Sequence, residues 1–171
     1  GVEIVKSYDT PDWSPDKAQQ QMEQSITALG EDGFDAVYSA NDGMAGGAIA
    51  ALKGADIDPA DRFVTGQDAE VAGIQRILTG EQLMTVYQPI IDIAETSAEL
   101  AVPIAQGKQP AGDVAPDKVD NGMKEVPSAL LDTFAVGKDE IQDTVIKEGF
   151  LKVDQICTKA YAKACKEAGI Q

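Results

Sequence analysis

The stretch Asp35-Ala-Val-Tyr-Ser-Ala-Asn-Asp-Gly43 is a short run of strand-forming residues that ends abruptly in polar and turn-forming ones. The same arrangement recurs in Arg62-Phe-Val-Thr-Gly-Gln-Asp-Ala69 and in Leu83-Met-Thr-Val-Tyr-Gln-Pro89. Helical patterns fill the intervals, at residues 44–53 and 70–78. Strands that alternate with helices are typical of βαβ units in a parallel sheet. The sequence therefore predicts an α/β fold organised around these three strands.

A polar side chain follows each of the three strands, namely Asn41, Asp68 and Gln88. Ligands bind outside the carboxyl ends of the strands in open parallel sheets, so we expect these side chains to face one crevice. An amide both donates and accepts hydrogen bonds and an ionised carboxylate accepts them, which suits a ligand rich in hydroxyl groups. The alternative interpretation is local, with Asp42 and Asp68 each capping the helix that follows. Three polar ends at one sheet edge favour a binding site.

Trp13 is the only tryptophan, and it lies in a polar loop between Asp12 and Ser14 rather than inside an element. One interpretation is a loop anchor that packs on its own domain. The other is a stacking platform at the mouth of the crevice, where an aromatic plane would meet the apolar C–H face of a sugar ring. Trp13 is therefore a further candidate ligand-binding residue.

The composition disfavours several functional classes for this chain. Its 14 basic and 29 acidic residues give a formal net charge of −15, which disfavours nucleic acid and anionic lipid as partners. There is no histidine, so the usual general base and the commonest zinc ligand are missing. Gly43–Gly47 lacks the spacing of a phosphate loop, and Asp56–Asp61 lacks the register of a calcium loop. We expect no enzymatic activity, no cofactor and no metal.

Further elements are expected along the rest of the chain. Ser14 followed by Pro15 predicts a helix with Ser14 as its N-cap, which Gly30 ends. The pattern also predicts strands at 2–8, 123–126 and 130–136, and helices at 90–106, 138–146 and 153–168. Nothing in this chain is expected to cover the apolar side of the helix that starts at Ile90.

The last of these helices contains both cysteines, Cys157 and Cys165. Eight residues of straight helix would separate their Cα atoms by ~12 Å. A disulfide needs Cα atoms within roughly 7 Å of one another. Either the thiols are free, or the tail folds back on itself between them.

Three stretches carry a resemblance to a known family: Ser39-Ala-Asn-Asp-Gly-Met-Ala-Gly-Gly-Ala48, Thr65-Gly-Gln-Asp-Ala-Glu-Val-Ala-Gly-Ile74 and Met84-Thr-Val-Tyr87. They resemble the periplasmic sugar-binding proteins of ABC transporters, particularly those that bind D-xylose, and the likeness extends over nearly the whole chain. The resemblance implies a type I binding-protein fold in which two lobes hold a monosaccharide between them. Members with similar motifs bind xylose, glucose, galactose or arabinose, so the sugar stays open among the aldoses.

The resemblance also assigns roles to the four candidate residues. It implies that Trp13 stacks on the sugar, that Asn41 and Asp68 bind its hydroxyl groups, and that Gln88 is a polar contact from the hinge. For the tail, it implies that Cys157 and Cys165 form a disulfide.

The resemblance further implies how the chain divides. Residues 1–88 and 133–150 would belong to the carboxyl-terminal sugar-binding lobe. Residues 89–132 would cross the hinge and complete the amino-terminal lobe, and residues 151–171 would form the carboxyl-terminal tail. Family members are much longer, so we expect a fragment of a longer protein that lacks the amino-terminal half.

The implied partners are a monosaccharide, the permease of an ABC transporter and the missing amino-terminal half. The implied location is extracytoplasmic, in the periplasm or as a cell-surface lipoprotein. An alternative with the same fold is the sugar-sensing effector domain of a transcription regulator or membrane sensor. A helix-turn-helix upstream would indicate the regulator, and a signal peptide or lipoprotein cysteine would indicate transport.

Overall fold

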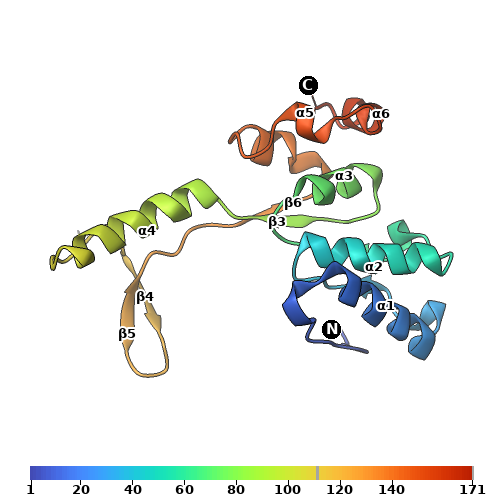
Figure 1. The fold of residues 1–171 in the computed structure, drawn as a ribbon, viewed down its shortest axis with the longest axis horizontal. Coiled ribbons are helices and arrows are strands. Elements are labelled where there is room, and N and C mark those ends of the chain that lie inside the picture. The colour runs from blue at the N-terminus through green and yellow to red at the C-terminus, as the bar shows by residue number, and fades with distance from the viewer. Residues whose placement is uncertain (111, 171) are drawn as a thin grey trace. The chain divides into compact units, whose positions relative to one another are not determined.

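The computed structural model describes residues 1–110 and 112–170, which form two compact units. The first unit comprises Gly1–Tyr87 together with Phe134–Gln171, and the second comprises Gln88–Thr133 (Figure 1). The expected assignment of these segments to two lobes stays a prediction.

The first unit contains the three expected strands. Strands β1 (Ala36–Val37) and β2 (Phe63–Val64) pair in parallel, with Ala36 opposite Phe63. The segment around β3 (Thr85–Tyr87) runs beside β2 in the same direction, because Leu83 N donates to Val64 O (2.8 Å) and Val86 N to Gly66 O (3.2 Å). The α/β prediction is confirmed. Strand β6 (Phe134–Val136) pairs antiparallel with β3, an arrangement that the sequence pattern did not predict.

Three helices alternate with these strands: α1 (Pro15–Leu29), α2 (Asp42–Gly54) and α3 (Val71–Thr79). Helix α1 begins as predicted, since the Ser14 hydroxyl accepts from Lys17 N (3.4 Å). A Cβ atom at Gly47 would collide with the carbonyl oxygen of Pro15. This glycine therefore allows α2 to pack closely on α1.

Two hydrophobic clusters form the core of this unit. One lies between α1, α2 and the first two strands, and consists of Met22, Phe34, Ala45, Ala48, Ile49, Ala51, Leu52, Ile57 and Val64. The other packs α3, β3 and β6 against the carboxyl-terminal residues, and includes Ile74, Ile77, Leu78, Tyr87, Val136, Ile141, Val145, Ile156 and Ile170. Short 3₁₀ helices connect the elements at Pro11–Trp13 (η1), Glu31–Gly33 (η2) and Pro59–Asp61 (η3).

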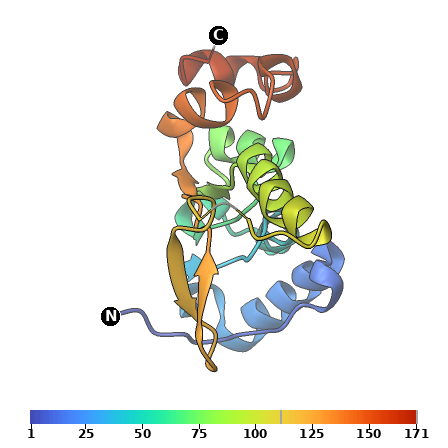
Figure 2. The same ribbon diagram turned by 90° about the vertical axis from the view of Figure 1, so that its left-hand side faces the viewer.

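The prediction of a strand at residues 2–8 is wrong. These residues belong to no helix or strand, and the chain runs there as an extended coil (Figure 2). The side chains of Val2 and Ile4 are 98% and 80% exposed. A strand is stable only when its backbone groups pair with a neighbour, and this segment pairs with no described strand.

The region after β6 also differs from the predicted helix at 138–146. It is a 3₁₀ turn, η4 (Lys138–Glu140), followed by a turn of π-helix, η5 (Gln142–Ile146). Ile141 and Val145 are nevertheless both fully buried, so the shared face that the pattern predicted is confirmed. The segment packs against α3 although its hydrogen-bond spacing is not that of an α-helix.

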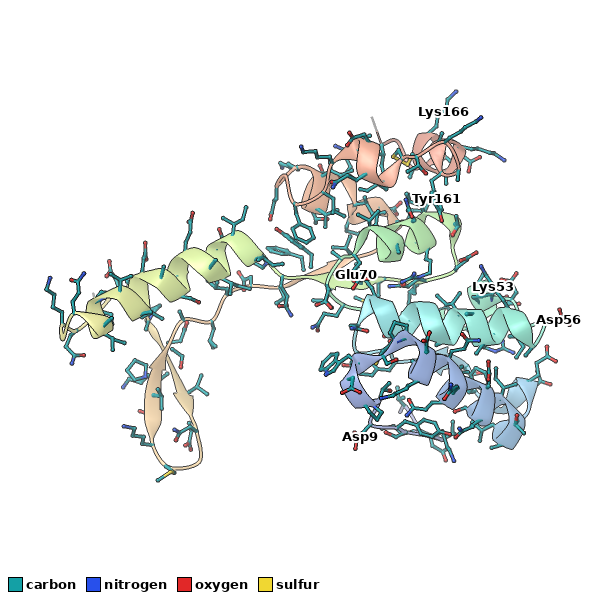
Figure 3. All side chains as sticks on the ribbon, viewed as in Figure 1. Asp9, Lys53, Asp56, Glu70, Tyr161 and Lys166 are labelled. Atoms are coloured by element: carbon teal, nitrogen blue, oxygen red, sulfur yellow. A yellow bond between two sulfur atoms is a disulfide. The ribbon has the colours of Figure 1, made fainter. Side chains whose placement is uncertain are left out.

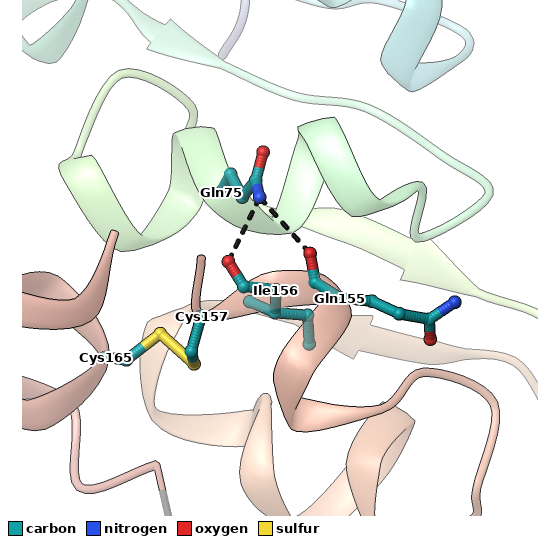
Figure 4. Close-up of a disulfide and its surroundings, with 5 residues drawn as sticks. All are labelled: Gln75, Gln155, Ile156, Cys157 and Cys165. Atoms are coloured by element: carbon teal, nitrogen blue, oxygen red, sulfur yellow. Dashed lines mark hydrogen bonds between the residues drawn. A yellow bond between two sulfur atoms is a disulfide. The ribbon is translucent and has the colours of Figure 1, made fainter. Parts of the chain in front are cut away.

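The carboxyl-terminal tail folds back between its two cysteines. Helix α5 (Val153–Ile156) and helix α6 (Ala162–Glu167) are separate, and a disulfide joins Cys157 to Cys165 with their Cα atoms 5.9 Å apart. A continuous helix at 153–168 is therefore wrong, and the disulfide that the resemblance implied is confirmed. Gln75 of α3 donates from Nε2 to the carbonyl oxygens of Ile156 (3.0 Å) and Gln155 (3.5 Å), which ties the tail to α3 (Figure 4).

Reducing the disulfide should lower the free energy of unfolding by about 2–3 kcal/mol, because the unfolded chain regains the entropy of a short closed loop. Equilibrium unfolding in denaturant with and without reductant would measure this difference. A Cys157→Ser/Cys165→Ser variant should match the reduced protein and show no response to reductant. Equal stability of the oxidised and reduced proteins would contradict the prediction.

The second unit consists of helix α4 (Ile90–Ala105) and a hairpin of β4 (Asp117–Asp120) and β5 (Glu125–Ser128). The predicted helix is confirmed. The strand expected at 123–126 lies two residues later, because residues 121–124 form the turn of the hairpin. Asn121 Oδ1 accepts there from the backbone N–H groups of Met123 and Lys124 (both 3.0 Å), and Gly122 has φ +84°.

The apolar side of α4 is uncovered, as the sequence predicted. No residue of α4 is buried, and Ile90, Ile91 and Ile104 are exposed. Of the described helices, none is both long and apolar enough to cross a membrane.

Candidate functional site

The loops that follow β1 and β2 are joined to one another at the carboxyl edge of the sheet. Asp42 N donates to the carbonyl oxygen of Gln67 (2.9 Å), and Ser39 N donates to Thr65 Oγ1 (3.3 Å). Asn41 directly precedes Asp42 in the sequence, and Asp68 directly follows Gln67. The structure therefore brings these two candidate residues to the same edge.

Asn41 is the N-cap of α2. Its Oδ1 accepts from Met44 N (2.8 Å), so the interpretation of Asp42 as the cap is wrong. Capping uses an acceptor lone pair on the carbonyl oxygen and leaves the side-chain amide nitrogen of Asn41 with two N–H donors. The partly exposed amide group is thus fixed in orientation by the helix that it caps.

Asp68 has an exposed side chain and a backbone in the left-handed region, with φ +93°. The next residue, Ala69, also has a positive φ of +50°. Such conformations cost about 1–3 kcal/mol each for residues other than glycine, and they cluster at functional sites. The carboxylate accepts no hydrogen bond from the described residues and projects from a loop that the surrounding structure must hold in place.

Trp13 ends the short helix η1, where both it and Asp12 have positive φ angles of +53° and +59°. Its side chain is 58% exposed, which contradicts a loop anchor packed into its own domain. A Cβ atom at Gly43 would lie 3.5 Å from Cγ of Pro15, so the start of α1 lies against the start of α2. The loop that carries Trp13 therefore reaches the region of Asn41.

Gln88 follows β3 directly, as the sequence predicted, but it is the first residue of the second unit. The structure therefore groups Trp13, Asn41 and Asp68 on one unit and does not include Gln88 among them. The side chain of Gln88 is partly exposed.

Asp42 is a residue whose importance the sequence analysis missed. Its side chain is fully buried and accepts from Gln82 Nε2 (2.7 Å), Glu70 N (2.9 Å) and Thr85 Oγ1 (3.0 Å). Burial raises the pKa of the Asp42 carboxyl, while these hydrogen bonds and the charge of Arg76 counteract that rise. A useful signal was present, since an Asn-Asp pair at a helix start offers two side chains for one capping position.

Arg76 completes the buried network. Its Nη2 donates to the backbone carbonyl of Asp42 (2.6 Å), and its Nε donates to Gln82 Oε1 (3.0 Å). Burial lowers the pKa of the Arg76 guanidinium, and the carboxylates of Asp42 and Glu70 oppose that effect. The network thus connects the start of α2 to α3 and to the segment before β3.

Glu70 stands at the N-terminus of α3 (Figure 3). Burial raises the pKa of the Glu70 carboxyl above its ordinary value of 4.5, and the negative charges of Asp42 and Asp68 raise it further. The folded state therefore holds this proton more tightly than the unfolded chain does. The associated stability is present at acid pH and is lost as pH rises through the folded-state pKa.

Replacing Glu70 by glutamine should therefore stabilise the protein at neutral pH but not below pH 4.5. The gain should stay under about 1 kcal/mol, because Glu70 is largely exposed and solvent screens its charge. Denaturant unfolding at the two pH values measures the effect, with Glu148→Gln as an exposed control of the same charge change. A Glu70→Gln protein that is less stable than wild type at neutral pH would contradict the assignment.

In the part of the chain that the structure describes, no group of three or more His, Cys, Asp or Glu side chains is placed to hold a metal ion. Asn41 and Asp68 place an amide donor and a carboxylate at the sheet edge, and Trp13 has an exposed indole. These groups can bind hydroxyl groups and stack on an apolar ring face.

Comparison with known proteins identifies the family. A family model described as a periplasmic binding protein domain matches residues 1–109. The chain belongs to this family. It is 42% identical over 155 residues to the D-xylose-binding periplasmic protein of Escherichia coli K12, covering 91% of this chain and 46% of that protein. It is 34% identical over 161 residues to the multiple sugar-binding periplasmic receptor ChvE of Rhizobium radiobacter, covering 91% and 45%.

Solved structures of the family share the fold. A carbohydrate transporter solute binding protein from Chloroflexus aurantiacus, in complex with D-glucose, superposes with a TM-score of 0.72 at 30% identity, over 84% of this chain and 42% of that one. An ABC transporter solute binding protein from Clostridium phytofermentans, with bound β-D-glucose, gives 0.72 at 27% identity, over 91% and 48%. The chain spans less than half the length of the curated relatives that it matches.

Proposed function

We propose that the chain supplies one sugar-contacting lobe of an extracytoplasmic solute-binding protein, which delivers an aldose to an ABC transporter. The observation that carries the proposal is the meeting of the Asn41 and Asp68 loops at one sheet edge. The chain is also 42% identical to a protein named for binding D-xylose. The sugar is xylose or a related monosaccharide.

The residue roles follow from the chemistry of each group. Asp68 accepts hydrogen bonds from two sugar hydroxyls, because its carboxylate is exposed and has no other partner among the described residues. Asn41 donates from Nδ2, because its Oδ1 is occupied by the helix cap. Trp13 stacks on the C–H face of the ring, and Gln88, the residue after β3, is proposed as a further amide contact.

The remaining contacts come from a second lobe, which the rest of the longer protein supplies. Closure of the two lobes around the sugar is a hinge motion of the kind that such proteins use. The permease recognises the closed form. The proposed protein binds and releases its ligand without chemistry, and the proposal includes no cofactor.

A titration of the full-length protein with aldopentoses and aldohexoses tests the proposal. Trp13 is the only tryptophan of this chain, so its emission reports on stacking directly, provided that other tryptophans are replaced. Sugar at 100 times its dissociation constant should stabilise the protein by about 2.7 kcal/mol and raise the unfolding temperature. An open-chain sugar alcohol is the matched control. If no aldose shifts either signal, the proposed function is wrong.

A further inference from the structure

Three consecutive backbone amides in the loop that carries Asp68 are all hydrogen-bonded. Asp68 N donates to the carbonyl oxygen of Val86 (2.9 Å), Ala69 N donates to Thr85 Oγ1 (3.1 Å), and Glu70 N donates to Asp42 Oδ2 (2.9 Å). Two of the three acceptors are therefore side chains of other elements. A loop with two successive positive φ angles persists only when its surroundings over-determine it.

The two side-chain acceptors also bind one another. Thr85 is fully buried, and its hydroxyl donates to Asp42 Oδ2 (3.0 Å) while it accepts from Ala69 N. A hydroxyl can donate and accept at the same time, which neither an apolar nor a purely acceptor side chain can do. Thr85 therefore links Ala69 of the strained loop to the buried carboxylate, beside the direct bond from Glu70 N to the same carboxylate oxygen.

The space around the carboxylate is shaped for it. A Cβ atom at Gly66 would collide with Asp42 Oδ1, and one at Gly73 would collide with Asp42 Oδ2. Neither glycine has a positive φ angle. Their lack of a side chain therefore allows the close approach of Asp42 and is not needed for a turn. The carboxylate therefore has a fixed position from which to hold Glu70 N.

We propose that Thr85 and Asp42 are positioning residues for the sugar site, holding the left-handed Asp68–Ala69 backbone so that the Asp68 carboxylate faces the ligand. The inference rests on the proposed function for the identity of the ligand. It goes beyond that function by assigning buried residues that do not touch the sugar. The three hydrogen-bonded amides and their acceptors all lie within this chain, so this geometry is observed independently of the ligand.

The test compares Thr85→Val, which keeps the shape but removes the hydroxyl, with Thr85→Ser, which restores it. Amide exchange measured by NMR in this chain should accelerate about tenfold at Ala69 and Glu70 in Thr85→Val and return towards wild type in Thr85→Ser. In the full-length protein, affinity for the preferred aldose should fall about tenfold in Thr85→Val and recover in Thr85→Ser.

Val145→Ala is the control for a loss of stability alone, because Val145 is fully buried in the core cluster that includes Ala69 but takes no part in the hydrogen bonds of Asp42 and Thr85. If Thr85→Val and Val145→Ala changed exchange at residues 69 and 70 and sugar affinity equally, Thr85 would have only a structural role and the proposal would be overturned. If the wild type bound no aldose, the proposed function would fail, yet the exchange result would still decide whether the loop is held.

Should Thr85→Val not fold, the wild-type protein itself provides the readout. A Thr85 hydroxyl fixed between Asp42 and Ala69 exchanges slowly enough with water to be observed by NMR. A protected hydroxyl proton supports the proposal. A hydroxyl that exchanges as fast as that of the exposed residue Thr133 overturns it.

Discussion

Replacing Asp42 by asparagine should lower the free energy of unfolding by about 3 kcal/mol, the largest effect on stability that we expect from one side chain. The carboxylate accepts hydrogen bonds at both oxygens, from Gln82, Glu70 and Thr85. An amide in the same position has only one oxygen. Its N–H₂ group would therefore face either the Gln82 donor or the Glu70 and Thr85 donors, and it cannot accept from them. At least one buried donor then loses its partner, which costs more than the lost bond alone.

The burial that raises the pKa of Asp42 partly offsets this loss of stability, because burying a neutral amide costs less free energy than burying a charge. For that reason we expect the lower end of the range for a broken buried charge network. In a thermal scan the loss corresponds to about 6–12 °C for a chain of this size. Asp35→Asn, which removes an exposed carboxylate, is the matched control. A difference of under about 1 kcal/mol between the two variants would show that the network contributes little.

Replacing Asp68 by alanine should weaken sugar binding by about 2–5 kcal/mol, or from roughly thirtyfold to several thousandfold. In the proposed closed site, hydroxyl groups that pair with the carboxylate would be left without an acceptor and shielded from water. The measurement is a calorimetric or fluorescence titration of the full-length protein with the aldose that binds best. The unfolding temperature without sugar, measured in parallel, separates the loss of binding from the backbone strain of alanine at a positive φ.

Asp56→Ala is a close control for this change. Asp56 is also an exposed aspartate with a positive φ, +58°, but it follows the carboxyl end of α2 rather than a strand. Both variants therefore place alanine at a positive φ, and only Asp68 lies at the proposed site. If Asp68→Ala bound every tested aldose as tightly as Asp56→Ala did, the site assignment would be wrong.

Local signals in the sequence were enough to place most helices of the first unit. Ser14 and Pro15 start α1 because a hydroxyl cap and a fixed proline φ act within one turn. The alternation of strands and helices also predicted the parallel pairing of β1 and β2. The same reasoning failed for Val2–Tyr8, since β-branched residues favour an extended chain but do not supply a partner strand.

The candidate site shows the same division. Trp13, Asn41, Asp68 and Gln88 could be selected from the sequence because each lies in a polar loop next to a predicted strand or helix. The choice between Asn41 and Asp42 could not be made in that way. Two adjacent polar residues at a helix start are equivalent by propensity, and only packing against Gly66 and Gly73 decides which is buried.

By itself, the sequence determined what depends on neighbours along the chain: the order of strands and helices from β1 to α4, the Ser14 cap of α1, and the polar residues that end the strands. The tertiary structure decided what depends on distant partners. It gave Asp42 its three donors from residues 28 to 43 positions away, joined the loops of Asn41 and Asp68, and placed β6 beside β3. These contacts form because buried polar groups must find hydrogen-bond partners, and the fold alone brings such partners within reach.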